Sequence, residues 1–451
     1  MKIIIAGIGK VGITLAQQLS AEGHDITLID QDNLLLEETA AQFDALGVCG
    51  NCASRDILLT AGVAEAELLI AVTDADEINL LCCMTAHGIH ADIHTIARIR
   101  TPEYTEQIMT MPEVFPLSMT VNPEKQAALE IERLLKYPGF LRRDTFAKGL
   151  VEIVELQIHE DSKLCNVSLS DLSSIVKCRV LVCAVLRAGS AVAPSGNFVL
   201  KRGDRIFVTA PTDTLALLLK NLGIITRRVR NVMICGGSRV SYYLADLLAD
   251  SSINVQLIER DRERCRELAA LLPNASVIHG DCSNLQFLDQ QGVGQMDALL
   301  SLTGMDETNM ITSLHGNARG IPQIITKLSR GAGSFADTLP LGSIICPKEL
   351  SGNAIVRYVR AMQNQTGAAV SVHAIADGQV EAVEFLVDGN TRNCGIPLKK
   401  LKLKANVLLA SITHGVETQI PGGDSVFTEG DTVVVVTSGR GVLHNINDIF
   451  A

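Results

Sequence analysis

Tryptophan is absent from the 451 residues, and only 4% of the residues are aromatic. This composition does not fit a carbohydrate-binding protein, and 47% hydrophobic residues do not fit a disordered chain. Long apolar runs are also missing. The longest one, at 180–186, has seven residues, whereas a membrane-spanning helix needs about 20. We therefore expect a cytoplasmic protein, with frequent glycine and aliphatic residues typical of α/β domains.

Basic clusters are scarce. The formal net charge is −11, and the one lysine-rich run is LKKLKLK at 398–404. Proteins that bind nucleic acids normally carry a basic patch. We therefore expect no nucleic-acid partner, and we interpret residues 398–404 as a solvated edge.

Signatures of several enzyme classes are missing too, including a Ser-His-Asp arrangement and HExxH. The 12 cysteines and the absence of a signal peptide suggest reduced thiols. A candidate cluster lies within one stretch: Cys49, Cys52, Cys82, Cys83, His87, His90 and His94. A metal or redox site there is the weaker alternative, because no second CxxC pair follows at zinc spacing and cysteine often serves as a small buried residue.

The chain repeats itself. Gly7 and Gly236 are 229 residues apart, as are Asp30 and Glu259. Further along, the interval becomes 230 for several pairs: Gly50 and Gly280, Thr73 and Thr303, Glu77 and Glu307, Asn79 and Asn309. A single inserted residue explains the shift, so the sequence indicates a duplication.

Each half begins with apolar strands that alternate with helical patterns, which predicts a doubly wound parallel sheet. Short strands joined by glycine-containing turns follow, which predicts a small β-rich domain. We expect four domains: 1–122 and 229–347 as Rossmann-like units, and 140–225 and 366–451 as small α+β units.

The first glycine loop has the context of a dinucleotide-binding fingerprint. It follows a strand, opens a helix and precedes an acidic residue, Asp30, by about 20 positions. The loop residues are Gly7, Ile8, Gly9, Lys10, Val11 and Gly12. The first glycine permits the turn, the second lets the backbone approach a pyrophosphate, and the third lets helix and strand pack. Asp30 would bind ribose hydroxyls and repel a 2′-phosphate, which favours NAD over NADP.

Other candidate residues follow strands, at the sheet edge where open α/β domains bind ligands. They are Asn51, Thr73, Asp74 and Arg98, of which Arg98 could neutralise phosphate charge. Capping and turn formation explain Asn51 and Thr73 equally well, and Glu77 and Asn79 are interpreted as residues at a helix start.

The second loop is only partly preserved. It comprises Gly236, Gly237, Ser238, Arg239 and Val240, and Ser238 and Ser241 replace the second and third glycines. Glu259 keeps the acidic position and Lys327 stands opposite Arg98. A side chain at position 238 crowds a pyrophosphate, so we expect weaker or different nucleotide binding in this half.

Several motifs together resemble the TrkA family, the NAD-binding regulatory subunits of bacterial Trk potassium-uptake systems. They are GIGKVG with Asp30, AVTDADEINLL (71–81), ARIRTPEY (97–104) and YPG (137–139). The resemblance covers the whole chain and implies two RCK-N domains, each followed by an RCK-C domain (regulator of potassium conductance).

The resemblance implies a function without turnover. A ring of these domains would lie on the inner face of the membrane, under a potassium-translocating integral-membrane subunit. NAD(H), ATP or ADP in the clefts would change the ring's shape and so the opening of the pore. An NAD-dependent oxidoreductase and a scaffold with vestigial clefts are the alternative hypotheses.

Overall fold

The computed structural model describes residues 1–136, 140–160, 162–222, 229–329, 339–362, 369–376, 378–404, 406–438, 443 and 445–451. The YPG motif at 137–139 and the expected domain limits at 225 and 366 lie outside these residues. Four sheets are formed, two of them parallel and two antiparallel. The fold class predicted from the sequence is therefore confirmed.

The first parallel sheet has the strand order β3-β2-β1-β4-β5-β6. Its strands are β1 (Lys2–Ala6), β2 (Asp25–Asp30), β3 (Leu46–Cys49), β4 (Leu68–Ala71), β5 (His94–Arg98) and β6 (Met119–Val121). The helices of this domain are α1 (Lys10–Ala21), α2 (Asn33–Phe43), α3 (Arg55–Thr60), α4 (Asp76–Ile89) and α5 (Pro102–Thr110). The order reverses between β1 and β4, so the carboxyl ends of these strands frame a crevice of the kind that binds ligands in open α/β sheets.

The second parallel sheet repeats this topology, with the order β14-β13-β12-β15-β16-β17. Its strands are β12 (Asn231–Cys235), β13 (Asn254–Glu259), β14 (Ala275–His279), β15 (Ala298–Ser301), β16 (Gln323–Lys327) and β17 (Ser343–Ile345). Its helices are α9 (Arg239–Leu248), α10 (Arg262–Leu271), α11 (Leu285–Gln290) and α12 (Asp306–Ala318). Aliphatic residues fill the central strands of both sheets, because helices cover both faces.

The two small domains are antiparallel sheets with the orders β10-β9-β11-β8-β7 and β18-β19-β22-β20-β21. The first contains β7 (Arg142–Phe146), β8 (Val151–Gln157), β9 (Leu181–Arg187), β10 (Ser190–Val192) and β11 (Arg205–Pro211), with α7 (Leu172–Val176) and α8 (Leu215–Leu222). The second contains β18 (Ala369–Ile375), β19 (Val380–Leu386), β20 (Val407–His414), β21 (Glu417–Gln419) and β22 (Thr432–Ser438).

The two antiparallel sheets share one hydrophobic cluster, to which both contribute buried residues such as Phe207 and Val434. A hydrogen bond joins a residue of β7 to a residue of β18: Asp144 Oδ1 lies 2.9 Å from His373 Nδ1. Asp144 and His373 are 229 residues apart. The two copies of the small domain therefore meet through equivalent positions, as subunits of a two-fold dimer do.

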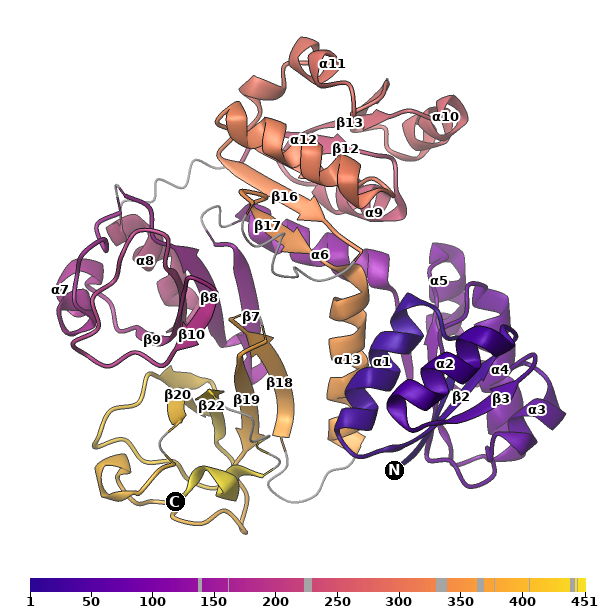
Figure 1. Cartoon of the computed structure of the whole chain (residues 1–451), viewed down its shortest axis with the longest axis horizontal. Helices are drawn as coiled ribbons and strands as arrows, with labels where there is room; N and C mark the ends of the chain where they lie inside the picture. Colours follow the sequence, from indigo (N-terminus) through magenta and orange to yellow (C-terminus); the bar gives the residue numbers. More distant parts are fainter. Residues whose placement is uncertain are drawn as a thin grey trace. The chain divides into compact units, whose positions relative to one another are not determined.

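The chain forms two compact units, Met1–Ala128 with Cys346–Tyr358 and Leu129–Ile345 with Val359–Ala451. The helices that follow the parallel sheets, α6 (Pro123–Lys136) and α13 (Pro347–Met362), each pass from one unit to the other. In the first unit α13 packs on α1, where a Cβ at Gly352 would lie 3.6 Å from Thr14 Cγ2 (Figure 1). In the second unit α6 accepts a hydrogen bond at Leu134 O from Gln323 Nε2, at 2.8 Å. Each half thus gives a helix to the nucleotide-type domain of the other half.

None of the helices in the described ranges has the length and hydropathy needed to span a bilayer.

Candidate functional site

Two glycines of the first loop are required by packing. Gly7 follows β1 with a φ of +97°, and a Cβ there would lie 2.8 Å from the backbone nitrogen of Thr73. A Cβ at Gly12 would lie 2.0 Å from the carbonyl oxygen of Gly7. Both positions need glycine because the strand, the turn and the helix approach closely.

Gly9 is different. Its φ of −70° suits any residue, and a Cβ there would meet no other described atom within 4 Å. The fold itself therefore does not require glycine at this position. The sequence predicts that a pyrophosphate binds in the open space in front of Gly9.

The N-terminus of α1 is open to an anion. Among the described residues, no side chain caps its first turn. Lys10 is exposed there, whereas Ile8 and Val11 point into the core with exposures of 0% and 6%. Uncapped backbone N–H groups and the helix dipole favour a negatively charged ligand at this end.

Asp30 ties the loop to the second strand. Its Oδ2 accepts a hydrogen bond from the backbone N–H of Ile8 at 2.7 Å, and its Oδ1 accepts one from Asp32 N–H at 3.0 Å. Each carboxylate oxygen has a second lone pair, so ribose hydroxyls can still donate to it. Nearby, Asn51 Oδ1 accepts a bond from Ala53 N–H at 3.0 Å, which closes a turn after β3.

Thr73, Asp74 and Arg98 come together at the ends of β4 and β5. The Arg98 side chain donates from Nη2 to Thr73 O at 2.6 Å and to Asp74 Oδ1 at 2.9 Å. Arg98 is 9% exposed, and its buried Nε–H has no hydrogen-bond partner among the described residues. The ends of β4 and β5 thus hold a buried guanidinium, a group that pairs well with phosphate.

In the second loop, serine hydroxyl groups form hydrogen bonds within the loop at the positions where the first loop has glycines. Ser238 Oγ accepts a hydrogen bond from Ser241 N–H at 3.4 Å and so caps α9. Ser241 Oγ donates to Gly236 O at 2.6 Å. The amide of Gly237 donates to Glu259 Oε2. The second loop is thus capped from within, and fewer donors remain for a phosphate.

The remaining predicted residues of the second half also gather at this sheet edge. Arg239 is exposed on the first turn of α9, and Val240 is buried. Glu259 Oε1 accepts a bond from Asp261 N–H at 2.7 Å, as Asp30 does from Asp32. Lys327 ends β16 at the position that Arg98 has on β5. The hydrogen bonds from the acidic residue to the loop are therefore retained in the second half, while the residues expected near a phosphate differ.

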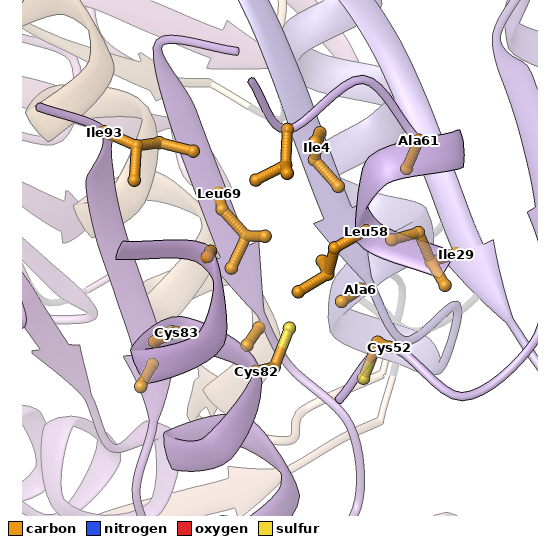
Figure 2. Close-up of a cluster of buried hydrophobic side chains, with 14 of the residues drawn as sticks. Ile4, Ala6, Ile29, Cys52, Leu58, Ala61, Leu69, Cys82, Cys83 and Ile93 are labelled. Carbon is orange, nitrogen blue, oxygen red and sulfur yellow. The ribbon is translucent and has the colours of Figure 1, made fainter. Parts of the chain in front are cut away.

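Three of the four cysteines in the candidate metal or redox cluster contribute to the core, whereas Cys49 is exposed. Cys52, Cys82 and Cys83 lie in one hydrophobic cluster with Ile4 and Leu58 (Figure 2). Burial raises the pKa of the Cys83 thiol well above its ordinary value. Within the described ranges, no group of three or more His, Cys, Asp or Glu side chains is placed to hold a metal ion.

Sequence reasoning missed the role of Asn79. It was interpreted as a residue at a helix start, yet it is fully buried and bonds to Thr73 and Arg98. The signal was available, because Thr73 and Asn79 recur together as Thr303 and Asn309.

Comparison with known proteins supports the same organisation. Residues 3–114 and 232–333 match the TrkA-N domain family, and residues 153–223 and 382–446 match the TrkA-C domain family. The Trk system potassium uptake protein TrkA of Haemophilus influenzae is 30% identical over 100% of this chain and 98% of its own length. A TrkA homolog of Archaeoglobus fulgidus is 31% identical over 96% of this chain and 97% of its own length.

Solved structures agree in fold. The GsuK RCK domain aligns with a TM-score of 0.61 and 16% identity, covering 97% of this chain and 92% of that one. The GsuK channel bound to NAD aligns with the same score and identity, covering 97% of this chain and 77% of that one. The duplicated TrkA-N and TrkA-C domains and the full-length similarity show that the chain belongs to the TrkA family of Trk potassium-uptake proteins.

Proposed function

We propose that this chain is a nucleotide-sensing regulatory subunit, without turnover, that controls a potassium-translocating membrane protein. The names of its relatives support a role in potassium uptake, and GsuK, which has the same fold, is a channel seen with NAD. NAD(H) is the proposed ligand of the first cleft, and ATP or ADP would compete for it.

The open N-terminus of α1 is the observation that supports this proposal most. It combines free space at Gly9 with an uncapped helix end. Asp30, bonded to the loop at Ile8, would hold the ribose, and Arg98 supplies a guanidinium at the ends of β4 and β5. A diphosphate linked to a ribose satisfies each of these groups at once.

A change at the ligand has a direct route to the rest of the chain. The ligand would contact one end of α1, and α13 packs along the same helix. A Cβ at Gly352 would come within 3.2 Å of Gln18 Oε1, so the two helices are closely packed. Ser351 Oγ donates to Gln126 Oε1 at 2.8 Å, which also links α13 to α6. A shift of α1 on binding would therefore move two helices that lead into the small domains.

The proposed assembly is a homo-oligomeric ring, peripheral on the inner face of the cell membrane and docked on an integral-membrane Trk subunit. In that arrangement nucleotide-dependent movement of α6 and α13 would change the ring and hence the pore. The nucleotide shifts the equilibrium only as far as it binds one ring shape more tightly than the other.

Calorimetry on the purified chain with NADH, NAD, ATP and ADP tests the first step. We expect saturable binding that Asp30→Ala weakens, without oxidation or reduction of the nicotinamide at 340 nm across candidate substrates. Turnover at 340 nm would favour the oxidoreductase alternative, and no binding of any adenine nucleotide would favour a scaffold.

A further inference from the structure

Asn79 links the ends of two strands at the candidate site. It lies on α4 with 0% exposure. Its Oδ1 accepts bonds from Thr73 N–H at 2.8 Å and from the Thr73 hydroxyl at 2.7 Å. Its Nδ2 donates to Thr73 O at 3.2 Å and to Arg98 O at 2.9 Å. Every hydrogen-bonding group of the amide is thus used, and the end of β4 is held to the end of β5.

The second half contains the same arrangement. Asn309 accepts bonds from Thr303 N–H and hydroxyl at 2.8 and 2.7 Å, and donates to Thr303 O and Lys327 O at 3.2 and 2.9 Å. The two halves differ in the glycine loop and in the cation at the end of the fifth strand. The asparagine arrangement is therefore independent of both differences.

Only a carboxamide can make this set of bonds. The two backbone carbonyls need donors, and the threonine N–H and hydroxyl need an acceptor. Aspartate in its ionised form would supply acceptors alone and would face two carbonyl oxygens. Alanine would leave buried polar groups without partners.

The bonds of Asn79 fix residues that the proposed ligand would meet. Thr73 and Arg98 both stand at the carboxyl edge of the sheet, and the Arg98 side chain in turn binds Thr73 O and Asp74. Asn79 itself is buried beneath them and does not face the crevice. Its effect on a ligand must therefore pass through Arg98 and the Thr73–Asp74 turn.

We propose that Asn79 is a positioning residue for nucleotide binding, which sets the place of the Arg98 guanidinium against a phosphate. This inference rests on the proposed function. In the second half Asn309 holds the equivalent turn, where Gly304 and Lys327 replace Asp74 and Arg98. Asn309 would therefore fix the backbone there, but no arginine side chain would be positioned by it.

The duplication supplies a matched control. Asn79→Ala and Asn309→Ala remove the same bonds from similar buried sites, so we expect similar losses of thermal stability. Calorimetry on the full chain would measure ADP, and competition against ADP would measure adenosine. We expect Asn79→Ala to weaken ADP at the first cleft at least tenfold while adenosine changes less than threefold. Asn309→Ala should leave first-cleft ADP affinity within twofold.

The ratio of ADP to adenosine affinity distinguishes positioning from a general structural role. If Asn79→Ala does not fold, Asn79→Ser keeps one small polar group and removes most of the bonds, and the same change in the ratio is expected. An unchanged ratio in the folded variant, or equal losses from Asn79 and Asn309 variants, would overturn the inference alone. Absence of binding of any adenine nucleotide to the unmodified chain would instead overturn the proposed function on which it rests.

Discussion

Replacing Gly9 by alanine should separate ligand binding from folding. The methyl group would enter the space in front of the loop, where it meets no described atom within 4 Å. The backbone at Gly9 has a φ of −70° and a ψ of −171°, which alanine adopts without strain. Glycine is better than alanine at a helix N-cap by no more than about 1 kcal/mol. The variant should therefore fold, with a small loss of stability.

The cost to binding is larger. Hydrogen bonds from backbone N–H groups to a charged phosphate contribute about 1.5–3 kcal/mol each. Displacing the phosphate so that a single bond is lost corresponds to roughly a 10- to 150-fold weaker affinity. Nucleotide affinity at the first cleft should fall by at least tenfold.

Gly12→Ala is the informative comparison. Its Cβ would lie 2.0 Å from Gly7 O, so the backbone must move, and overpacking of this kind costs about 1–3 kcal/mol. Thermal unfolding and calorimetry on both variants give the two readouts. Gly9→Ala should lose affinity with a near-normal melting temperature, and Gly12→Ala should lose both. Unchanged affinity in a folded Gly9→Ala protein would refute the location of the phosphate.

The remaining predictions concern Asp30, the second glycine loop and the carboxyl group of Glu130. Asp30→Ala should weaken NADH binding about tenfold or more, because charge-assisted bonds to the ribose are lost, and equal affinity in calorimetry would remove Asp30 from the site. Ser238→Gly should free the amide of Ser241 and raise the nucleotide affinity of the second cleft, measured by calorimetry; equal affinity of both clefts in the unmodified chain would contradict this. Glu130 is partly buried and lies 3.6 Å from Arg133. Desolvation, reinforced by Asp144, nevertheless raises its pKa from 4.5 to about 7. Between these two pKa values the folded state binds more protons than the unfolded state. The free energy of unfolding should therefore fall as pH rises through this range, by at most roughly 3 kcal/mol. Glu130→Gln should flatten the urea-unfolding profile between these pH values, and an already flat profile in the unmodified chain would argue against a buried neutral carboxyl.

The parts of the fold that follow apolar periodicity could be predicted from the sequence. The central strands β1, β2 and β4 are short aliphatic runs that alternate with helical patterns, and the structure has them in a parallel sheet. Because the sequence repeats at an interval of about 229 residues, the same parallel sheet could be predicted for the second half. The domain limits and the site residues remain predictions.

Strand β7 escaped prediction because its sequence, RRDTF, is charged. Two of its charged side chains are nevertheless buried, since Arg143 donates from Nε and Nη2 to Glu152 at 2.7 Å and Asp144 pairs with His373 across the two small domains. A local pattern cannot show that charges are neutralised by partners distant in sequence. The Arg142 guanidinium and the His373 ring hold the pKa of Asp144 at about 2 in spite of its burial.

Asn79 escaped for a related reason. A polar residue near a helix start normally indicates a cap, and only the tertiary structure brings Thr73 and Arg98 to its amide. The exchange of α6 and α13 between the units is also a long-range feature, since the sequence predicts the helices and not the surfaces against which they pack.

In the proposed function, nucleotide occupancy and potassium transport are coupled. Linkage requires that docking on the membrane subunit change nucleotide affinity by the same factor by which nucleotide changes the open–closed balance, a coupling of about 1–3 kcal/mol. The direct measurement is NADH and ATP affinity of the free chain and of the chain bound to its potassium-translocating subunit in nanodiscs, with potassium flux at matched nucleotide concentrations. We expect the two factors to agree, and the Gly9→Ala chain to dock without a nucleotide response of flux. A flux response that persists when nucleotide binding has been lost would contradict the account.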